Sequence, residues 1–225
     1  VYADRLEGAE DFESVLHDMI KETIKDHKRI IFNGNGYDDS WIKEATEKRG
    51  LLNLRTTPDA MPALLERKNV EMLTRHKVFT PAEIQSRYEI TLENYCKTVN
   101  IEAMTMVDMA RKEIVPAVEA YVHELSDTLV AKKSAVPGVA ARYETTTIER
   151  LAGLVDEIDA ATAALETEIF KYKTITDVTE ASHMIRDVIL PRMAELRVVC
   201  DEAETLTAEK YWPFPTYEKL LFGVR

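Results

Sequence analysis

The chain has 225 residues, of which 45% are hydrophobic, so it can bury a sizeable core in one large domain or two small ones. Its formal net charge of -11 argues against nucleic acid or an anionic membrane as a partner, because both require clustered Lys and Arg. No apolar run reaches the roughly 18 to 20 residues of a membrane span, and no signal peptide opens the chain. We therefore expect a cytoplasmic protein without a membrane partner.

Composition also points to the fold class. Only seven glycines and eight prolines occur, and Ala, Glu, Lys and Leu are abundant, which favours an all-α fold. We expect an elongated helical bundle with long antiparallel helices. Cys96 and Cys200 lie far apart within helical patterns, so both are interpreted as reduced packing residues.

Residues 1–57 are expected to form a helix-turn-helix subregion. A wide apolar face predicts a first helix from about Asp11 to Asp26. The β-branched and aromatic run Ile30–Phe32 then enters Asn33–Tyr37, which we interpret as a short extended segment with an Asn-Gly turn. Asn and Gly are the residues that tolerate positive φ in such turns.

Two further helix starts follow this turn. Asp39 can cap a helix from Ser40 to Arg49, and Gly50 would end it. An extended connector then leads to Thr57–Pro58, a hydroxyl cap followed by a proline, which predicts another helix start. We place the boundary here, so that residues 58–225 form the helical bundle domain.

The longest predicted helix runs from Thr80 to Lys133. Thr80, Pro81 and Glu83 offer a capping box with proline at the first helical position. Apolar residues then recur in steps of three and four, the spacing of one helix face. They are Ile84, Tyr88, Leu92, Tyr95, Val99, Ala103, Met106, Ala110, Ile114, Val118, Tyr121, Leu125 and Leu129.

Two more helices complete the predicted bundle. Residues 134–138 break the pattern and predict the tip of a helical hairpin. The next helix shows a 3.5-residue period, typical of a coiled-coil seam, and another is expected from about Asp177 to Leu206. The seam comprises Ile148, Leu151, Val155, Ile158, Thr162, Leu165, Ile169 and Tyr172.

Prolines interrupt the two longest patterns. Pro116 and Pro191 each remove one backbone hydrogen bond and crowd the preceding turn, so each helix should kink or break there. We hypothesise that the two kinks are paired and keep adjacent helices in contact.

The chain ends in an aromatic tail, residues 211–225, which we expect to be extended. Prolines at 213 and 215 exclude a continuous helix through Tyr211–Tyr217. The aromatic side chains of this segment should pack on the bundle or on a partner.

The Asn-Gly turn has some features of a phosphate-binding loop. Gly34 and Gly36 follow a strand-like run, as in a dinucleotide fingerprint, but Asp39 occupies the third glycine position. Asp38 and Asp39 would also repel an anion. A purely structural turn and a regulatory ligand site around Asn33–Tyr37 both stay open, and calorimetry with ATP, glutamate and glutamine would test the second.

Other candidate sites are weaker. A di-iron bundle requires Glu-x-x-His on two helices, and this spacing occurs once, at Glu180 and His183. No nucleophile elbow is present, and nothing in the sequence around Cys96 indicates an activated thiol. We therefore assign no catalytic, cofactor-binding or metal residue to this chain.

Several stretches resemble the C-terminal region of the large, type III bacterial glutamine synthetases. The similar segments cover most of the chain apart from residues 134–148 and much of the seam helix. They are Arg29–Tyr37, Lys48–Thr57, Ser86–Ile90, Leu92–Ala103 and Tyr211–Tyr217.

This resemblance implies a parent ligase of nitrogen metabolism that makes glutamine from glutamate, ammonia and ATP with divalent Mg or Mn, assembled as stacked hexameric rings. Its metal, nucleotide and glutamate sites would lie upstream. The chain begins at Val1 without an initiator Met, which suggests a piece of something longer. We expect it to bind the rest of the parent chain and neighbouring subunits, giving support and assembly without turnover. The alternative is a freestanding helical adaptor whose seam docks a partner helix.

Overall fold

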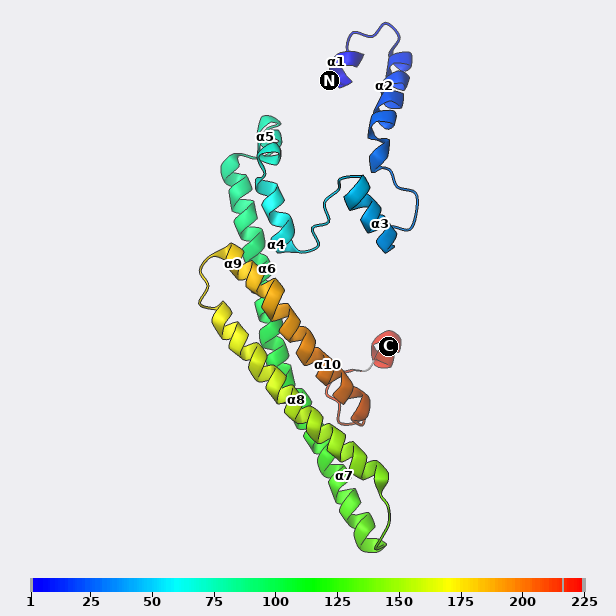
Figure 1. Ribbon diagram of the computed structural model, residues 1–225, viewed down its shortest axis with the longest axis vertical. Coiled ribbons are helices and arrows are strands. Elements are labelled where there is room, and N and C mark those ends of the chain that lie inside the picture. Colours follow the sequence, from blue (N-terminus) through cyan, green and yellow to red (C-terminus); the bar gives the residue numbers. More distant parts are fainter. Residues whose placement is uncertain (1, 216, 224–225) are drawn as a thin grey trace. The chain divides into compact units, whose positions relative to one another are not determined.

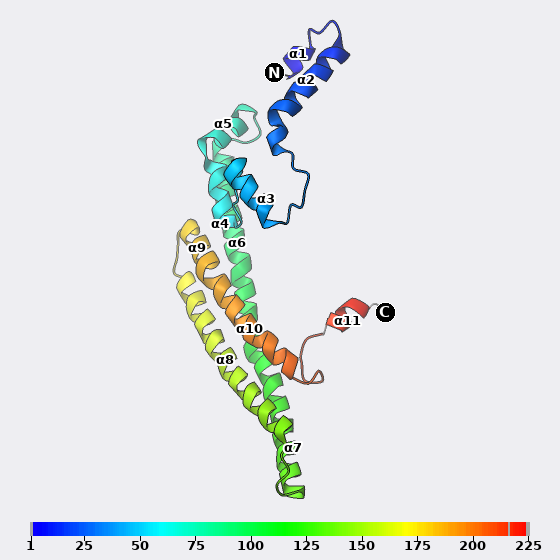
Figure 2. The ribbon, with the colours of Figure 1, turned by 45° about the vertical axis from the view of Figure 1, so that its right-hand side comes forward.

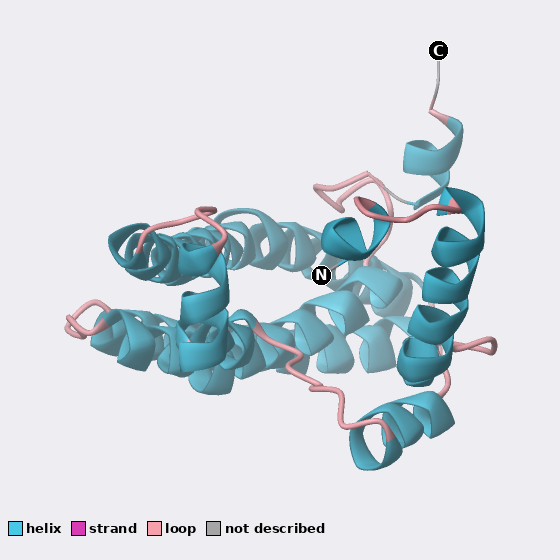
Figure 3. Ribbon diagram, turned by 90° about the horizontal axis from the view of Figure 1, so that it is seen from above, coloured by secondary structure: helices cyan, strands magenta, loops and turns pink. Residues whose placement is uncertain are grey.

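The computed structural model describes residues 2–215 and 217–223, and every regular element in that part of the chain is helical (Figures 1 and 3). The all-α prediction is confirmed. The chain divides into one compact unit that ends at Arg55 and a second that begins at Thr56. Within the described residues, no helix is both long enough and apolar enough to cross a membrane.

The first unit consists of short helices and the turns between them. They are α1 (Tyr2–Leu6), α2 (Phe12–His27), a 3-10 turn η1 (Lys28–Ile30), α3 (Asp39–Lys43) and a π-turn η2 (Glu44–Lys48). Asp11 begins α2 by accepting the backbone N–H of Ser14, so the predicted first helix is confirmed. Gly50 has a φ of +66°, as expected for a glycine that ends a helix.

Three local predictions in this region are wrong. Ile30 lies in the 3-10 turn, and the run that follows pairs with no strand among the described residues. The cap of α3 is Asp38 rather than Asp39, because the Asp38 carboxylate accepts the N–H of Ser40. The cap before Pro58 is Thr56 rather than Thr57, because Thr56 is extended and its hydroxyl accepts the N–H of Asp59.

The second unit is the helical bundle. It starts with α4 (Thr57–Ala60), η3 (Met61–Leu65) and α5 (Arg67–Arg75), and its first long helix comprises α6 (Pro81–Met109), η4 (Ala110–Ile114) and α7 (Val115–Ala135). The remaining elements are α8 (Arg142–Tyr172), α9 (Val178–Met184), η5 (Ile185–Ile189), α10 (Leu190–Leu206) and α11 (Tyr217–Phe222). In Figures 1 and 2, α8 runs antiparallel to its neighbours α7 and α10.

The start of the long helix follows the sequence signal. The Thr80 hydroxyl accepts the N–H of Glu83, and the Glu83 carboxylate accepts the N–H of Thr80, which completes the predicted capping box. Residues 134–138 form the tip of the hairpin, with Gly138 at a φ of +90°.

The predicted apolar stripes form the core of the bundle. Leu151, Ile158, Thr162 and Leu165 on α8 are completely buried, and they pack with buried residues of α6, α7 and α10. Ala103 and Val118 on the long helix are also completely buried. The 3.5-residue pattern therefore serves packing within the chain.

Each interior proline follows a π-turn. The turns η4 and η5 directly precede α7 and α10, in which Pro116 and Pro191 are the second residue. A π-turn shifts the hydrogen-bond register, which accommodates a residue without an N–H while the helix continues. The paired-kink hypothesis is wrong. Tyr88 of α6 bonds to Thr179 of α9 at 3.0 Å, and the two helices run in the same direction (Figure 1). Pro116 lies 28 residues beyond Tyr88 and Pro191 only 12 beyond Thr179, so the two prolines lie at different levels.

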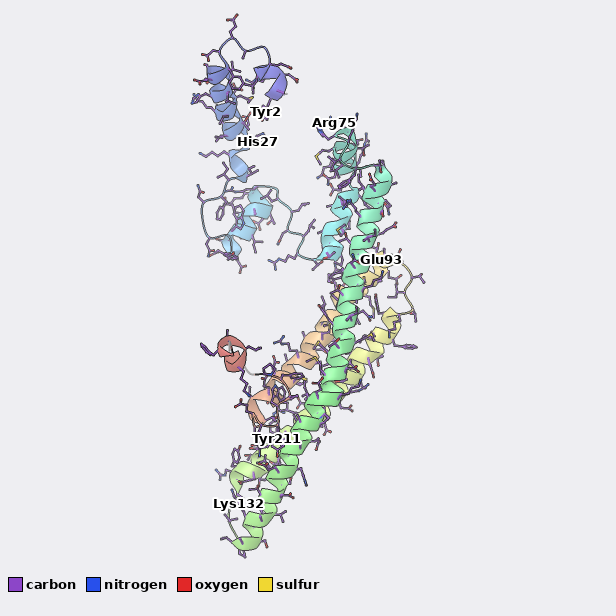
Figure 4. All side chains as sticks on the ribbon, turned by 180° about the vertical axis from the view of Figure 1, so that it is seen from behind. Tyr2, His27, Arg75, Glu93, Lys132 and Tyr211 are labelled. Carbon is purple, nitrogen blue, oxygen red and sulfur yellow. The ribbon has the colours of Figure 1, made fainter. Side chains whose placement is uncertain are left out.

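The aromatic tail packs on the bundle in part. Tyr211, Trp212 and Phe214 lie against the core, as predicted, and Figure 4 shows Tyr211 near the lower half of the long helix. The expectation of an extended tail is wrong from Tyr217 onward, where α11 forms. No proline occurs after residue 215, and the residues that follow include good helix formers. Thr216 and the side chain of Tyr217, which were part of the predicted aromatic segment, lie outside the described residues.

Candidate interaction site

The Asn-Gly turn is held in one conformation by local hydrogen bonds. The Asn35 side chain accepts the N–H of Tyr37 at 3.1 Å, and the backbone N–H of Asp38 bonds to the carbonyl of Asn35 at 3.3 Å. Asp38 in turn accepts the N–H of Ser40 at 2.7 Å. The N–H groups of Tyr37, Asp38 and Ser40 therefore have partners, and the loop leads directly into α3.

An aromatic and cationic cluster supports this turn. The rings of Phe32 and Trp41 stack with centroids 3.8 Å apart and an angle of 20° between their planes. The guanidinium carbon of Arg49 lies 5.0 Å from the Trp41 ring centre and 5.7 Å from that of Phe32. Arg49 also donates to the carbonyl of Ile31 at 2.9 Å and to the Glu44 carboxylate at 2.6 Å. We call Phe32, Trp41 and Arg49 the platform.

Gly34 is required by this packing and not by its backbone angles. A Cβ at position 34 would lie 2.6 Å from the Cζ atom of Phe32, whereas a Cβ at Gly36 would meet nothing within 4 Å. Neither glycine has a positive φ. The predicted turn therefore forms without a positive φ at either glycine, and the close approach of the Phe32 ring accounts for a glycine at position 34.

Tyr37 is presented to solvent at the end of the turn. Its side chain is 99% exposed, and only its backbone N–H takes part in the hydrogen bonds of the turn. Stacking of the platform holds the turn, but nothing in the turn requires an aromatic ring at this position. A large amphipathic side chain displayed on a held loop is suited to binding another protein surface.

The charge of the turn is negative. Hydrogen bonds from Ser40 hold the pKa of Asp38 below its ordinary value, so this carboxylate is ionised at neutral pH. The N–H of Ser40, at the start of α3 where a phosphate would bind, already bonds to Asp38. The arrangement therefore favours a protein contact at Tyr37 over an anionic ligand at the helix start.

The other candidate residues are not brought together. In the part of the chain that the structure describes, no three His, Cys, Asp or Glu side chains gather at a metal-sized site. Cys96 and Cys200 are buried free thiols, and burial raises the pKa of Cys200 to about 11, so it is not an activated nucleophile. Tyr88 bonds to the hydroxyl of Thr179 at 3.0 Å and belongs to the core.

The platform was not predicted from the sequence. Phe32, Trp41 and Arg49 are separated by eight or nine positions, and no short motif links an aromatic pair to an arginine at that spacing. The sequence feature that could have indicated the platform is the placement of Trp41 and Arg49 at opposite ends of the predicted helix from Ser40 to Arg49. Their convergence on Phe32 depends on how the turn folds back on α3 and η2.

Comparison with known proteins places the sequence in a family. The sequence pattern of the glutamine synthetase C-terminal domain matches residues 15–133, which include the turn and the platform. A glutamine synthetase of Butyrivibrio fibrisolvens is 40% identical over 218 residues, covering 97% of this chain and 31% of that protein. A type-3 glutamine synthetase of Dictyostelium discoideum is 27% identical over 217 residues, covering 93% of this chain and 29% of that protein.

A glutamine synthetase of Bacteroides fragilis strain YCH46 is also 27% identical over 217 residues, covering 91% of this chain and 28% of that protein. The chain thus spans less than a third of the length of each of these three relatives.

Proposed function

Because this chain belongs to the glutamine synthetase C-terminal domain family, we propose that it is the C-terminal region of a type III glutamine synthetase and acts in support and assembly. The whole enzyme would form glutamine from glutamate, ammonia and ATP. ATP and divalent Mg or Mn would bind in the remainder of the enzyme, and none of the residues of this chain is assigned to the chemistry. The type-3 relative supports the choice of type.

The observation that carries the role in assembly is the display of Tyr37. Its ring is 99% exposed, while the turn that bears it is fixed by Asn35 and by the platform. Because the turn that bears the ring is already fixed, less backbone ordering is needed when a partner buries it. We therefore assign Tyr37 a contact with the rest of the parent chain or a neighbouring subunit of a homo-oligomer.

Two substitutions in the full-length enzyme test this contact. Tyr37→Ser removes the ring, and Tyr37→Phe keeps its apolar area as the matched control. Light scattering coupled to size exclusion would measure the assembled mass, and a glutamine-formation assay would measure activity. We expect Tyr37→Ser to lower the assembled fraction and the activity, with Tyr37→Phe close to the parent. An unchanged mass and rate for Tyr37→Ser would overturn the proposed contact.

A further inference from the structure

Helix α2 carries an apolar stripe that its own unit covers only in part. Phe12, Leu16, Ile20 and Ile24 recur every four residues and therefore lie along one side of the helix. The exposed fractions of Phe12, Ile20 and Ile24 are 54%, 48% and 53%, and Leu16 is half-buried. We call these four residues the α2 stripe.

The short helix α1 packs beside the first half of this stripe, because Met19 and Thr23 lie seven positions after Phe12 and Leu16 and so on the same side of α2. Tyr2 and Thr23 share a hydrogen bond of 3.0 Å, and Arg5 forms an ion pair with Glu22 at 3.0 Å. Met19, four positions before Thr23, is the one residue of α2 that is buried. The contacts of α1 therefore lie along Met19 and Thr23, whereas Ile20 and Ile24 lie further round the helix and stay about half exposed.

The first unit is too weakly packed to leave such a stripe in water. Among its described residues only Met19 and Ala45 are buried hydrophobic side chains. Two buried hydrophobic side chains are a small core for a unit that runs from Val1 to Arg55, although domains of about this length can fold alone. A partner surface over the stripe would remove its remaining exposed apolar area from water, which is the main driving force for association.

We infer that the α2 stripe docks the portion of the longer polypeptide that precedes residue 1, an inference that rests on the proposed function. The matched family is a C-terminal domain, and more than two thirds of each relative lies outside the match, which places that length upstream. The occupant is an apolar surface of the upstream portion.

Thiol labelling of single cysteine variants tests this inference. Ile20→Cys places a thiol on the stripe, and Asp18→Cys places one on the opposite side of α2, where the Asp18 side chain is 66% exposed. Cys96 and Cys200 are buried, so their labelling in the parent chain sets the background. Each variant is labelled with a maleimide in the 225-residue chain and in the full-length enzyme, after circular dichroism confirms that helix content is unchanged.

We expect Ile20→Cys to react more slowly in the full-length enzyme than in the 225-residue chain, by about tenfold or more. Asp18→Cys should react at similar rates in both. Equal rates for Ile20→Cys in both proteins would overturn the inference. Slow labelling of Ile20→Cys already in the 225-residue chain would also overturn the inference. Slow labelling that did not depend on protein concentration would show that the helical bundle covers the stripe. Slow labelling that increased with concentration would show that a second copy of the chain covers it. An active enzyme with an unprotected Ile20→Cys would reject the docking surface while leaving the proposed function in place.

Discussion

Arg186 of η5 donates a hydrogen bond to the carboxylate of Asp59 in α4, although the two residues are 127 positions apart. The same guanidinium forms two hydrogen bonds with Asp187, at 2.6 and 2.7 Å. These bonds raise the pKa of Arg186 above its ordinary value, so it remains cationic. The Arg186 side chain is 26% exposed, and it ties the first short helix of the bundle to η5.

Loss of this tie should destabilise the bundle. Arg186→Met keeps most of the side-chain volume but leaves Asp59 without its cationic partner, so we expect the melting temperature to fall by about 2 to 4 °C. Arg192→Met is the matched control, because Arg192 pairs with Glu195 on the exposed surface of α10 and such pairs contribute little. Differential scanning calorimetry measures both variants. Equal melting temperatures for the two would show that the tie to Asp59 is not stabilising.

The two glycines of the turn should differ sharply in their tolerance of alanine. Gly34→Ala forces the Phe32 ring away from its position, and overpacking of this kind costs about 1 to 3 kcal/mol. Gly36→Ala adds a methyl group in open space and should be tolerated. Near-ultraviolet circular dichroism reports the Trp41 environment. If Gly34→Ala gave the same spectrum and unfolding curve as Gly36→Ala, the close approach of Phe32 would not be essential to the turn.

The bundle was predictable from sequence because its helices are specified locally. The capping box of Thr80 and Glu83 marks the start of the long helix. The seven-residue spacing of Leu151, Ile158 and Leu165 identifies the buried side of α8. The π-turns were not predictable, because a proline in a helical pattern equally suits a kink, a break or a shift of register.

The candidate site depends on contacts that local pattern does not encode. Gly34 could be recognised as a turn residue, but its reason, the Phe32 ring, follows from tertiary packing with Trp41 and Arg49. The solvent exposure of Tyr37 also depends on how the turn packs against the platform, which the local sequence does not specify.

Attachment of the tail should depend on pH. Glu124 of α7 accepts hydrogen bonds from Lys210 and Tyr211, and these bonds hold its pKa below the ordinary value of 4.5. Because the pKa is lower in the folded state, the stabilising effect is present above pH 4.5 and is lost as the pH falls through the folded-state value. We therefore expect Glu124→Gln to loosen the tail at neutral pH, with the difference from the parent disappearing in acid.

Fluorescence of Trp212 measures this attachment in a Trp41→Phe background. Glu124→Gln should shift the emission to longer wavelength at pH 7, because Trp212 packs against the core beside the bonded Tyr211. Glu119→Gln, at an exposed position on the same helix, is the control and should leave the emission unchanged. If the emission spectrum of Glu124→Gln matched that of the parent at pH 7, Glu124 would not be needed to hold the tail on the bundle.

We propose that this chain supports a glutamine synthetase without performing its chemistry. An assay of glutamine formation from glutamate, ammonia and ATP with Mg or Mn, with the 225-residue chain and the full-length enzyme under the same conditions, tests this proposal. We predict product from the full-length enzyme and none above background from the chain alone. Glutamine formation by the chain alone at a rate comparable to that of the full-length enzyme would contradict the account.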